Sequence, residues 1–362
     1  MTEAAGLRLL HLNASAGYGG GEHQTWLLVT ELERLGVENH VLARRGSRLA
    51  ARLARELPAG RVHLLPPFAV SLTLPLASAW LAWRLGVTHL HAHTGRATLG
   101  FLLAGRVFRV AHRRIPDLPR HDGLRRLRGA DAVLCISAEI ARRLAATGLG
   151  AGGKPRLETV HSSVEELERT SLRPAILAGS PVLGFLGHFR RHKGLDLLLR
   201  ALPALLPAHP GLVLHLVGGG VEETSLRALA AELKLGDAVR FHPFTDQPLE
   251  TMAALDLFVM PSREEGMGSV ALQAQALGIP VLATTAGGIA EGVAHGLTGW
   301  LVEPESVPAL AEGLRRLLDD AAWRRSLGEA GPAWVREHFS AALMAHRTLS
   351  IDLALRRDRE GA

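Results

Sequence analysis

The sequence predicts an α/β protein made of two doubly wound, parallel-sheet domains. Three observations predict this fold class: the length of the chain, an alternation of short apolar runs with helical patterns, and one break in that alternation. A chain of 362 residues suits two domains of ordinary size better than one. Apolar residues make up 47% of the chain and charged residues 21%, so each half can bury a core.

Short apolar or β-branched runs, typical of buried strands, recur along the first half of the chain. We expect strands at residues 7–12, 40–42, 62–65, 87–91, 107–111 and 132–136. Helical patterns such as 22–35 and 137–146 separate these runs. Several helices are followed by a glycine that suits the left-handed position closing a helix, namely Gly36, Gly86, Gly236 and Gly278. Strands that alternate with helices imply parallel sheets covered on both faces.

The alternation breaks at residues 164–179 and restarts with a strand pattern at 181–186. Further strands are expected at 212–217, 239–241, 257–260 and 281–283. Three helical stretches follow from Ser306, and no strand follows the last of them, 341–357. We therefore expect two Rossmann-like domains, 1–168 and 169–340, and a separate C-terminal helix within 341–362.

Positive charge is concentrated in residues 106–128. The net charge is +6, and this stretch holds a dense group of arginines, Arg106, Arg109, Arg113, Arg114, Arg120, Arg125, Arg126 and Arg128. Such density suggests an anionic partner, either a phosphate-bearing acceptor or a membrane surface, while a solvated basic face remains the alternative. We do not expect nucleic acid, because aromatic residues make up only 4% of the chain and no stacking platform is visible.

The longest apolar stretch, residues 64–83, is interrupted by three prolines and by hydroxyl side chains. We expect a buried strand, loop and helix there rather than an interfacial segment or a membrane-spanning helix. The first residues do not resemble a signal peptide, and the one cysteine, Cys135, fits a reducing compartment. The expected location is the cytoplasm.

Glycine-rich turns from strand to helix are the clearest ligand-binding signal. In doubly wound sheets, ligands bind beyond the carboxyl ends of the strands, where helix N-termini offer free N–H groups. The second half has such turns at 187–194, 218–220, 265–268 and 287–288, and the first half has one at 19–21. Several turns at corresponding places favour a phosphate-bearing ligand. The first strand lacks the G-x-G-x-x-G spacing, which disfavours a nicotinamide site.

One further glycine run, residues 148–155, nearly matches the phosphate loop of nucleotide triphosphatases. It ends in a proline where that loop needs Ser or Thr for magnesium, and it follows a helix rather than a strand. We expect a flexible loop. His91 and His93 have the spacing of metal ligands, but no Cys or carboxylate partner is evident nearby, so a hydrogen-bonded role at a strand end is favoured over a metal.

These motifs together resemble the retaining glycosyltransferases of family four, which have the GT-B architecture. Residues 261–268 and 278–284 are similar to the donor segment PS-x-x-EG-x-G…G-x-PVVAT. Residues 287–291, 296–299 and 187–194 resemble the motifs GG-x-x-E, DG-x-TG and GR-L-x-x-x-KG. In the first half, residues 20–22, 91–93 and 131–137 resemble the GG-x-E turn, the H-x-H strand end and the aD-x-v-i-x-vS strand.

The resemblance implies a fold and a reaction. The two domains would face a cleft, and the C-terminal helix would cross back to the first domain. A sugar would move from a nucleotide-diphosphate sugar to an acceptor hydroxyl with retained configuration, in the synthesis of a cell-envelope glycolipid or polysaccharide. The acceptor would be a glycan or a lipid-linked molecule of anionic character. Independently of the resemblance, the charge of the stretch Arg106 to Arg128 suggests peripheral contact with the anionic inner face of the membrane.

The resemblance also implies roles for particular residues. Glu265 would contact hydroxyls of the donor sugar, Lys193 the diphosphate, and His112 the donor sugar from the first domain. Further substrate-binding candidates are Gly20, Gly21, His188, Arg190, Gly218, Gly266, Met267, Gly268, Ser269 and Gln273. The sequence has no Asp-x-Asp element, so we expect a reaction without a metal or other cofactor, in which protein cations and helix ends stabilise the leaving group.

Two positions depart from the family pattern. Gln273 stands where the family has the second acid of its E-x7-E pair, which holds the nucleotide ribose; an amide still accepts a hydrogen bond but lacks the charge. His188 stands where the family has an arginine on the diphosphate, and Arg190 is the candidate replacement. These departures keep two alternatives open: a non-catalytic subunit that binds nucleotide sugars, and a nucleotide-sugar epimerase of the same architecture.

Overall fold

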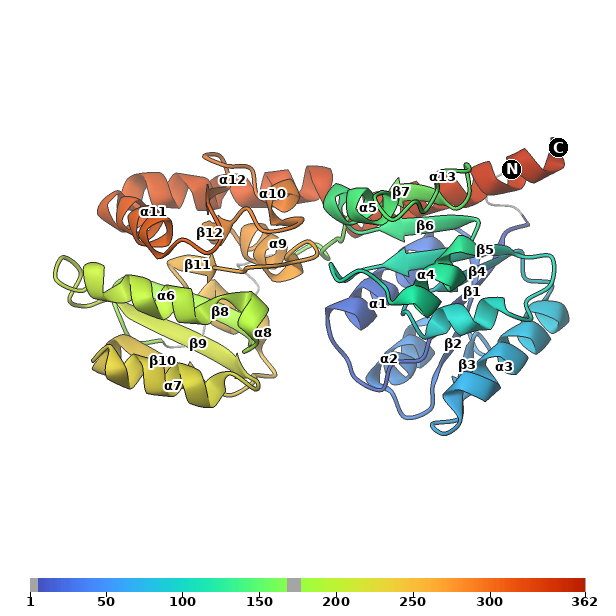
Figure 1. Cartoon of the computed structure of the whole chain (residues 1–362), viewed down its shortest axis with the longest axis horizontal. Helices are drawn as coiled ribbons and strands as arrows, with labels where there is room; N and C mark the ends of the chain where they lie inside the picture. Colours follow the sequence, from blue (N-terminus) through green and yellow to red (C-terminus); the bar gives the residue numbers. More distant parts are fainter. Residues whose placement is uncertain (1–5, 168–176, 362) are drawn as a thin grey trace. The chain divides into compact units, whose positions relative to one another are not determined.

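The chain forms two compact units, which are shown in Figure 1. One unit comprises Met1–Ser163 together with Ala341–Ala362, and the other comprises Val164–Ser340. The computed structural model describes residues 6–167 and 177–361. The predicted domain boundary at residues 168 and 169 lies outside the described residues. Each unit contains one parallel sheet with helices on both faces, so the predicted fold class is confirmed.

The sheet of the first unit has the strand order β3-β2-β1-β4-β5-β6-β7, and all of its pairs are parallel. Its strands are β1 (Arg8–Asn13), β2 (Glu38–Arg44), β3 (Val62–Leu65), β4 (His89–Ala92), β5 (Phe108–Arg113), β6 (Ala132–Cys135) and β7 (Arg156–Thr159). Its helices are α1 (Gly20–Arg34), α2 (Arg48–Glu56), α3 (Val70–Leu85), the 3-10 helix η1 (Ala97–Phe101), α4 (His121–Arg128), α5 (Ala138–Ala145) and α13 (Ala341–Glu360).

The sheet of the second unit has the order β10-β9-β8-β11-β12-β13, again with parallel pairs. Its strands are β8 (Val182–His188), β9 (Val213–Gly219), β10 (Val239–His242), β11 (Leu257–Met260), β12 (Val281–Thr284) and β13 (Gly299–Val302). Its main helices are α6 (Leu195–Ala201), α7 (Glu223–Glu232), α8 (Pro248–Ala253), α9 (Ser269–Ala276), α10 (Ile289–Gly292), α11 (Val307–Asp319) and α12 (Ala321–His338).

Successive side chains of each strand point to opposite faces, so each sheet has two apolar layers. In β1, Leu10 and Leu12 pack on the face covered by α3 and η1, and Leu9 packs on the other face with α1 and α13. In β11, Val259 belongs to the layer with α6 and α11, and Phe258 to the layer with α9. Burial on both faces explains why these strands read as continuous apolar runs.

Helix α13 returns from the end of the chain to the first unit. Its Met344, Ala345 and Leu355 are buried in the same cluster as Leu28 of α1 and Leu9 of β1. In Figure 1 this red helix lies beside the blue and green elements of that unit. The last helix of the chain is therefore part of the core of the first unit.

Two strands were not predicted from the sequence, β7 and β13. Both lie at a sheet edge, and β7 is half-buried throughout and contains Arg156 and Glu158. An edge strand needs apolar side chains at fewer positions, so its pattern is weak. The predicted helix-closing glycines are confirmed, since φ is +79° at Gly36 and +72° at Gly278.

Residues 64–83 form the end of β3, a loop and most of α3, as predicted, but the helix is not fully buried. Its outer face exposes Leu72 (72%), Leu76 (63%), Trp80 (51%) and Trp83 (81%). The prediction of a buried segment is wrong for this face, because only one side of α3 packs on the sheet. Among the described residues, no helix combines the length and the apolar character needed to cross a membrane.

Candidate functional site

The predicted site residues lie at the carboxyl edges of the two sheets. In the first sheet the strand order reverses between β1 and β4, and in the second between β8 and β11. Such reversal points open a crevice beyond the strand ends in doubly wound folds. His112 is the second-last residue of β5, while Lys193 and Glu265 lie in the turns that follow β8 and β11. Each unit is described separately below.

In the second unit, Lys193 and Glu265 form an ion pair between Lys193 Nζ and Glu265 Oε2. Their side chains are 18% and 17% exposed, so the pair is mostly shielded from solvent. The other carboxylate oxygen, Oε1, accepts a hydrogen bond from the N–H of Gly266 at 3.2 Å. Two turns that are 72 residues apart in sequence therefore present one cation and one carboxylate side by side.

The N-terminus of α9 lies directly after Glu265. Gly268 takes the left-handed conformation at the N-cap, with φ +73°. The N–H groups of Met267, Gly268 and Ser269 have no hydrogen-bond partner among the described residues. Free N–H groups at a helix N-terminus favour an anion such as a phosphate. The side chain of Met267 is buried at 2% exposure, so only its backbone can serve the predicted substrate-binding role.

Glycine is required where these turns touch one another. A Cβ on Gly194 would lie 2.0 Å from the carbonyl oxygen of Pro261, and a Cβ on Gly218 would lie 1.9 Å from that of Gly187. Both residues also have positive φ, +67° and +142°. No other residue fits such an approach. The predicted role of Gly218 is therefore at least structural, because its lack of a side chain lets β8 and β9 end together.

Arg263 is part of the site's framework and was not singled out by the sequence. Its Nη1 and Nη2 donate to the two carboxylate oxygens of Asp196 at 2.6 and 2.8 Å, and its Nε donates to Glu305 at 3.1 Å. The hydrogen bonds from Arg263 lower the pKa of Asp196, and those to Asp196 and Glu305 raise the pKa of Arg263. This bidentate contact fixes the turn after β11 against α6. The sequence does not reveal this contact, because neither Arg263 nor Asp196 belongs to a motif that predicts their pairing.

His188 and Gln273, which depart from the family pattern, and the candidate replacement Arg190 have few polar contacts in the structure. His188 is exposed, and its ring meets Phe244 edge-on at 4.9 Å between centroids. Arg190 is exposed and forms no ion pair with any described residue. Gln273 is half-buried on α9, and its side chain has no hydrogen-bond partner within residues 6–167 and 177–361. The structure does not bring these three into the Lys193–Glu265 contact.

In the first unit, four histidines of neighbouring strands form a cluster that we call the histidine cluster: His11, His91, His93 and His112. His91 Nδ1 lies 3.0 Å from His112 Nε2, and His11 Nδ1 lies 2.9 Å from His93 Nε2. The rings of His93 and His112 stack with centroids 4.2 Å apart. Among the described residues, no set of His, Cys, Asp and Glu side chains is arranged to hold a metal ion.

Burial disfavours the charged forms of His11, His93 and His112 in this cluster. Desolvation, followed by repulsion from His112 and Arg114, lowers the pKa of His93 well below its usual value. Desolvation also lowers the pKa of His112, with further contributions from Arg114 and His91. The sequence singled out His91, His93 and His112 separately. It did not predict their contact with His11, which depends on the pairing of β1 with β4.

Arg114 connects the cluster to the predicted glycine turn of α1. Its Nη2 lies 3.0 Å from His93 Nδ1, and its Nη1 donates to the carbonyl oxygen of Gly21 at 2.9 Å and to Thr25 at 2.8 Å. Burial lowers the pKa of Arg114 to about 10. Gly20 begins α1 and is exposed, so the turn holds Gly20 at the surface and Gly21 against Arg114.

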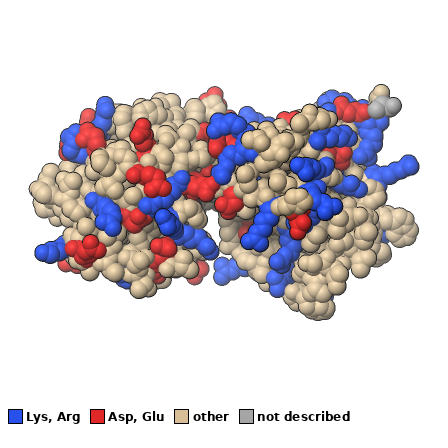
Figure 2. Space-filling model, viewed as in Figure 1, with Lys and Arg blue, Asp and Glu red and all other residues tan. Residues whose placement is uncertain are grey.

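The basic stretch is only partly a surface. Arg113 is 9% exposed and Arg114 is engaged internally, so both are corrections to the prediction of one continuous basic face. Arg113 is the last residue of β5 and Arg114 directly follows it, and both side chains are held inside the unit. The arginines that are exposed are Arg106, Arg120, Arg125 and Arg128. Figure 2 shows many Lys and Arg side chains over this unit, with few acids among them on the visible face.

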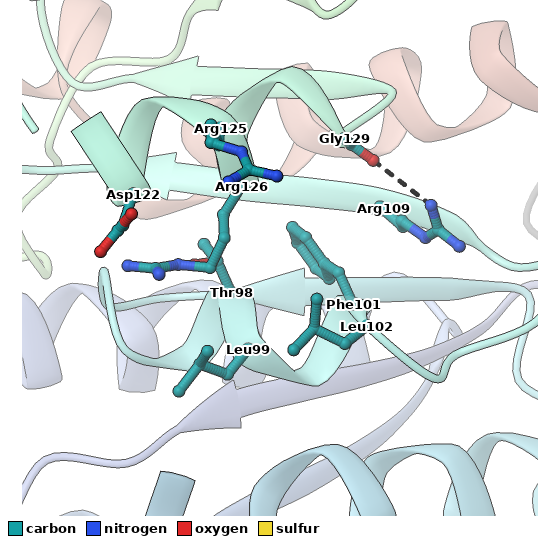
Figure 3. A pocket seen from close by; sticks show the side chains of 9 residues that line it. All are labelled: Thr98, Leu99, Phe101, Leu102, Arg109, Asp122, Arg125, Arg126 and Gly129. Atoms are coloured by element: carbon teal, nitrogen blue, oxygen red, sulfur yellow. Dashed lines mark hydrogen bonds between the residues drawn. The ribbon is translucent and has the colours of Figure 1, made fainter. Parts of the chain in front are cut away.

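A pocket of about 400 Å³ lies between η1 and α4. Figure 3 shows Leu99, Phe101 and Leu102 on the η1 side, and Arg125 and Arg126 on the α4 side. Arg126 Nε donates to Thr98 at 3.0 Å, which fixes that guanidinium at the pocket wall. The pocket combines apolar side chains with three arginines, Arg109, Arg125 and Arg126, against one acid, Asp122, so its lining carries a net positive charge.

Solved structures share this architecture across the whole chain. A glycosyltransferase from Rickettsia africae matches with a TM-score of 0.81 and 19% identity, over 96% of this chain and 98% of that chain. The Anabaena protein HepE, in complex with UDP and glucose, matches with a TM-score of 0.77 and 20% identity, over 95% of this chain and 99% of that chain. At this identity the matches establish the fold, which is GT-B.

Family models match both units in sequence. The model described as glycosyl transferases group 1 matches residues 169–334, and the model described as Glycosyltransferase Family 4 matches residues 18–165. The chain belongs to the GT-B glycosyltransferases.

Curated relatives of this GT-B glycosyltransferase match about half of its length. A GDP-mannose-dependent monoacylated alpha-(1-6)-phosphatidylinositol monomannoside mannosyltransferase of Corynebacterium glutamicum is 37% identical over 179 residues, 48% of this chain and 47% of the relative. A D-inositol 3-phosphate glycosyltransferase of Streptomyces avermitilis is 37% identical over 186 residues, 45% of this chain and 40% of the relative. The chain thus spans about half the length of the curated relatives it matches.

Proposed function

We propose that this GT-B glycosyltransferase moves a sugar from a nucleotide-diphosphate sugar to an acceptor hydroxyl, with retention and without a metal ion. The observation that carries the proposal is the Lys193–Glu265 pair beside the free N–H groups of α9. A cation and a helix N-terminus suit a diphosphate, and a carboxylate suits sugar hydroxyls.

The chemistry assigned to each group follows from its charge. As the bond between the sugar and the phosphate breaks, negative charge grows on the diphosphate. Lys193 and the N–H groups of α9 stabilise that charge, with Arg190 as a further cation. The donor then competes with Glu265 for Lys193, which leaves the carboxylate free to accept hydrogen bonds from sugar hydroxyls. Preorganised groups of this kind lower the barrier because they need no reorientation during the reaction.

The test is the Lys193→Ala variant, assayed with the donor identified by a thermal-shift panel of nucleotide sugars that includes GDP-mannose and UDP-glucose. We expect kcat to fall by about 10²–10³, the typical effect of removing one such contact. Lys154→Ala is the matched control, because Lys154 forms an exposed ion pair with Asp131 in the first unit. Near-normal turnover of Lys193→Ala refutes the diphosphate assignment. Tight nucleotide binding without transfer or donor hydrolysis in the wild type supports a non-catalytic subunit instead.

We further propose that the acceptor is anionic and lies at a membrane surface with anionic lipids. The names of two relatives contain phosphatidylinositol and inositol 3-phosphate, and both of these carry phosphate. The support within this chain is that η1 packs against both α3 and α4. The helix with the exposed apolar face, α3, and the helix with the exposed arginines, α4, therefore flank the same element. Apolar side chains next to cations are the usual combination of a peripheral membrane surface.

Vesicle co-sedimentation tests the membrane proposal. Arg125→Glu/Arg128→Glu should weaken binding to vesicles containing phosphatidylglycerol, by roughly 1 kcal/mol or more for each side chain, and added salt should weaken the wild type. Arg325→Glu/Arg336→Glu makes the same charge change on exposed residues of the second unit and serves as the control. Binding that does not depend on the anionic lipid content contradicts the proposal.

A further inference from the structure

The C-terminal helix places a carboxylate against the histidine cluster. Asp352 of α13 is completely buried, at 0% exposure, and its Oδ2 lies 3.2 Å from Nε2 of His91, which is also 0% exposed. Within the described part of the chain, this carboxylate accepts no hydrogen bond with good geometry, and His91 Nε2, which also lacks a hydrogen-bond partner, is the basic atom at ion-pair distance from it. The backbone carbonyl oxygen of Asp352 lies 3.1 Å from His89 Nε2. Two histidines of β4 thus fix this turn of α13.

A second contact continues from His91 to the candidate catalytic histidine. Nδ1 of His91 lies 3.0 Å from Nε2 of His112. The remaining nitrogen of His112, Nδ1, has no hydrogen-bond partner among the described residues, and the side chain is only half-buried. A line of polar atoms therefore runs from Asp352 through His91 to His112 and ends at a nitrogen that is open to a ligand.

The ring protons of His91 and His112 can be placed by starting from Asp352, at one end of this line of atoms. An unpaired buried charge is costly, and His91 Nε2 is the group at ion-pair distance from Asp352, so we place the proton of His91 on Nε2, where a small rotation of either side chain turns the contact into a hydrogen bond. With this single proton on Nε2, Nδ1 of His91 is an acceptor, and Nε2 of His112 must supply the proton for the contact between the two rings. Burial lowers the pKa of His112, so this ring is neutral near pH 7 and its Nδ1 keeps a free electron pair.

A second line of polar atoms runs from Arg114 through His93 and His11 to Asn39, and its protons can be placed in the same way. Arg114 can only donate, so His93 Nδ1 is an acceptor, and the proton of His93 lies on Nε2 toward His11 Nδ1. His11 then donates from Nε2 to Asn39 Oδ1 at 3.0 Å. Because His93 stacks on His112 and Arg114 stands behind it, a second proton on this part of the cluster is disfavoured.

We propose that Asp352 is a positioning residue that acts through His91 to hold His112 in the tautomer with the proton on Nε2, leaving Nδ1 as an acceptor for a substrate hydroxyl. The inference rests on the proposed transferase function and deepens it. It gives the C-terminal helix a role in the chemistry of the first unit. Removing the partner that orients a metal-binding histidine typically costs about tenfold to a hundredfold in affinity or activity, and we expect a loss of this order for His112.

The tautomers are tested first in the wild type, by 15N NMR of histidine-labelled full-length protein. His112 and His91 are assigned by the signals that disappear in His112→Gln and His91→Gln. We expect an unprotonated Nδ1 and a protonated Nε2 for both rings at pH 7. A protonated Nδ1 on His112 overturns the proposal. This readout does not need activity, so the proposal can fail or survive independently of the transferase assignment.

The variant Asp352→Asn keeps the size of the side chain and removes the carboxylate. We expect kcat to fall by about tenfold or more with an almost unchanged donor KM, and the His112 signals to show a mixture of tautomers. Asp358→Asn is the matched control, since Asp358 lies on the same helix but is exposed and paired with Arg156. If Asp352→Asn does not fold, the wild-type spectrum decides. Unchanged tautomers and unchanged kcat in a folded Asp352→Asn refute the role of Asp352.

Discussion

At the scale of single residues, the second unit presents a charged pair beside an uncharged amide. Lys193 and Glu265 neutralise each other across two turns, while Gln273 lies on α9 without a partner among the described residues. Gln273 follows the free N–H groups of α9 by one helical turn, and the family resemblance assigns this position to the nucleotide ribose. A neutral acceptor binds a hydroxyl less strongly than a carboxylate does.

The substitution Gln273→Glu should therefore preserve or tighten nucleotide binding. A carboxylate forms charge-assisted hydrogen bonds, so we expect a gain of roughly 1 kcal/mol, about fivefold in Kd. Calorimetry with the nucleoside diphosphate measures it. Gln247→Glu adds the same charge to an exposed residue at the start of α8 and serves as the control. Loss of binding in Gln273→Glu would place Gln273 away from the ribose.

At the scale of the elements, the turns of the second unit are held together by backbone contacts. Gly194 follows η3 (Arg191–Lys193) and is the N-cap of α6, and it approaches Pro261, which directly follows β11. Arg263 and Asp196 hold the same two turns together through side chains. Because Lys193 directly precedes Gly194, the position of the candidate catalytic lysine depends on this backbone contact.

Gly36 and Gly194 have similar positive φ but different surroundings. Replacing each by alanine therefore separates the stability cost of the left-handed conformation from the cost of a steric clash. Gly36→Ala meets open space at φ +79°, so it should cost only the left-handed conformation, about 1 kcal/mol. Gly194→Ala at φ +67° adds a clash with backbone and should cost clearly more, because a backbone carbonyl cannot move aside easily. Urea unfolding measures both. If both variants lose the same stability, the turns at Gly194 and Pro261 can move apart without a cost in free energy.

At the scale of the whole molecule, buried histidines are concentrated in the first unit. His89 is buried against α13, and desolvation lowers its pKa to about 4, opposed in part by Asp352. The pKa values of His11, His93 and His112 are lowered in the same direction, chiefly by burial. These groups fold in the neutral form, so their protonation favours the unfolded chain.

The free energy of unfolding should therefore fall as the pH drops below 6.5. Between the unfolded pKa of 6.5 and the folded value of about 4, the unfolded chain binds a proton that folded His89 does not bind. The stabilisation is present above pH 6.5, and at pH 5 His89 alone should have lost roughly 2 kcal/mol of it. Urea unfolding at pH 7 and pH 5 measures the loss. His89→Gln should reduce the pH dependence, whereas the exposed control His121→Gln should retain it.

Much of the molecule could be predicted, and the failures have physical causes. Strands that are buried on both faces, such as β1 and β11, leave continuous apolar runs that sequence alone reveals. The edge strand β7 contains Arg156 and Glu158 and leaves no such run, and the run in β13 is only four residues long. The apolar face of α3 was expected to be buried, because hydrophobicity shows that a segment is apolar but not whether another element covers it. Arg113 and Arg114 were counted as surface charge for the same reason.

The sequence by itself determined the fold class, the family and the residue types in the glycine-marked turns, since these are encoded by local periodicity and short motifs. Only the tertiary structure decided which side chains meet. Arg263 with Asp196, and Asp352 with His91 and His112, join residues that are far apart in the chain. Such contacts depend on strand order and on the return of α13 to the first unit. Local sequence patterns do not contain that information, because the same pattern forms the same helix or strand whichever elements become its neighbours.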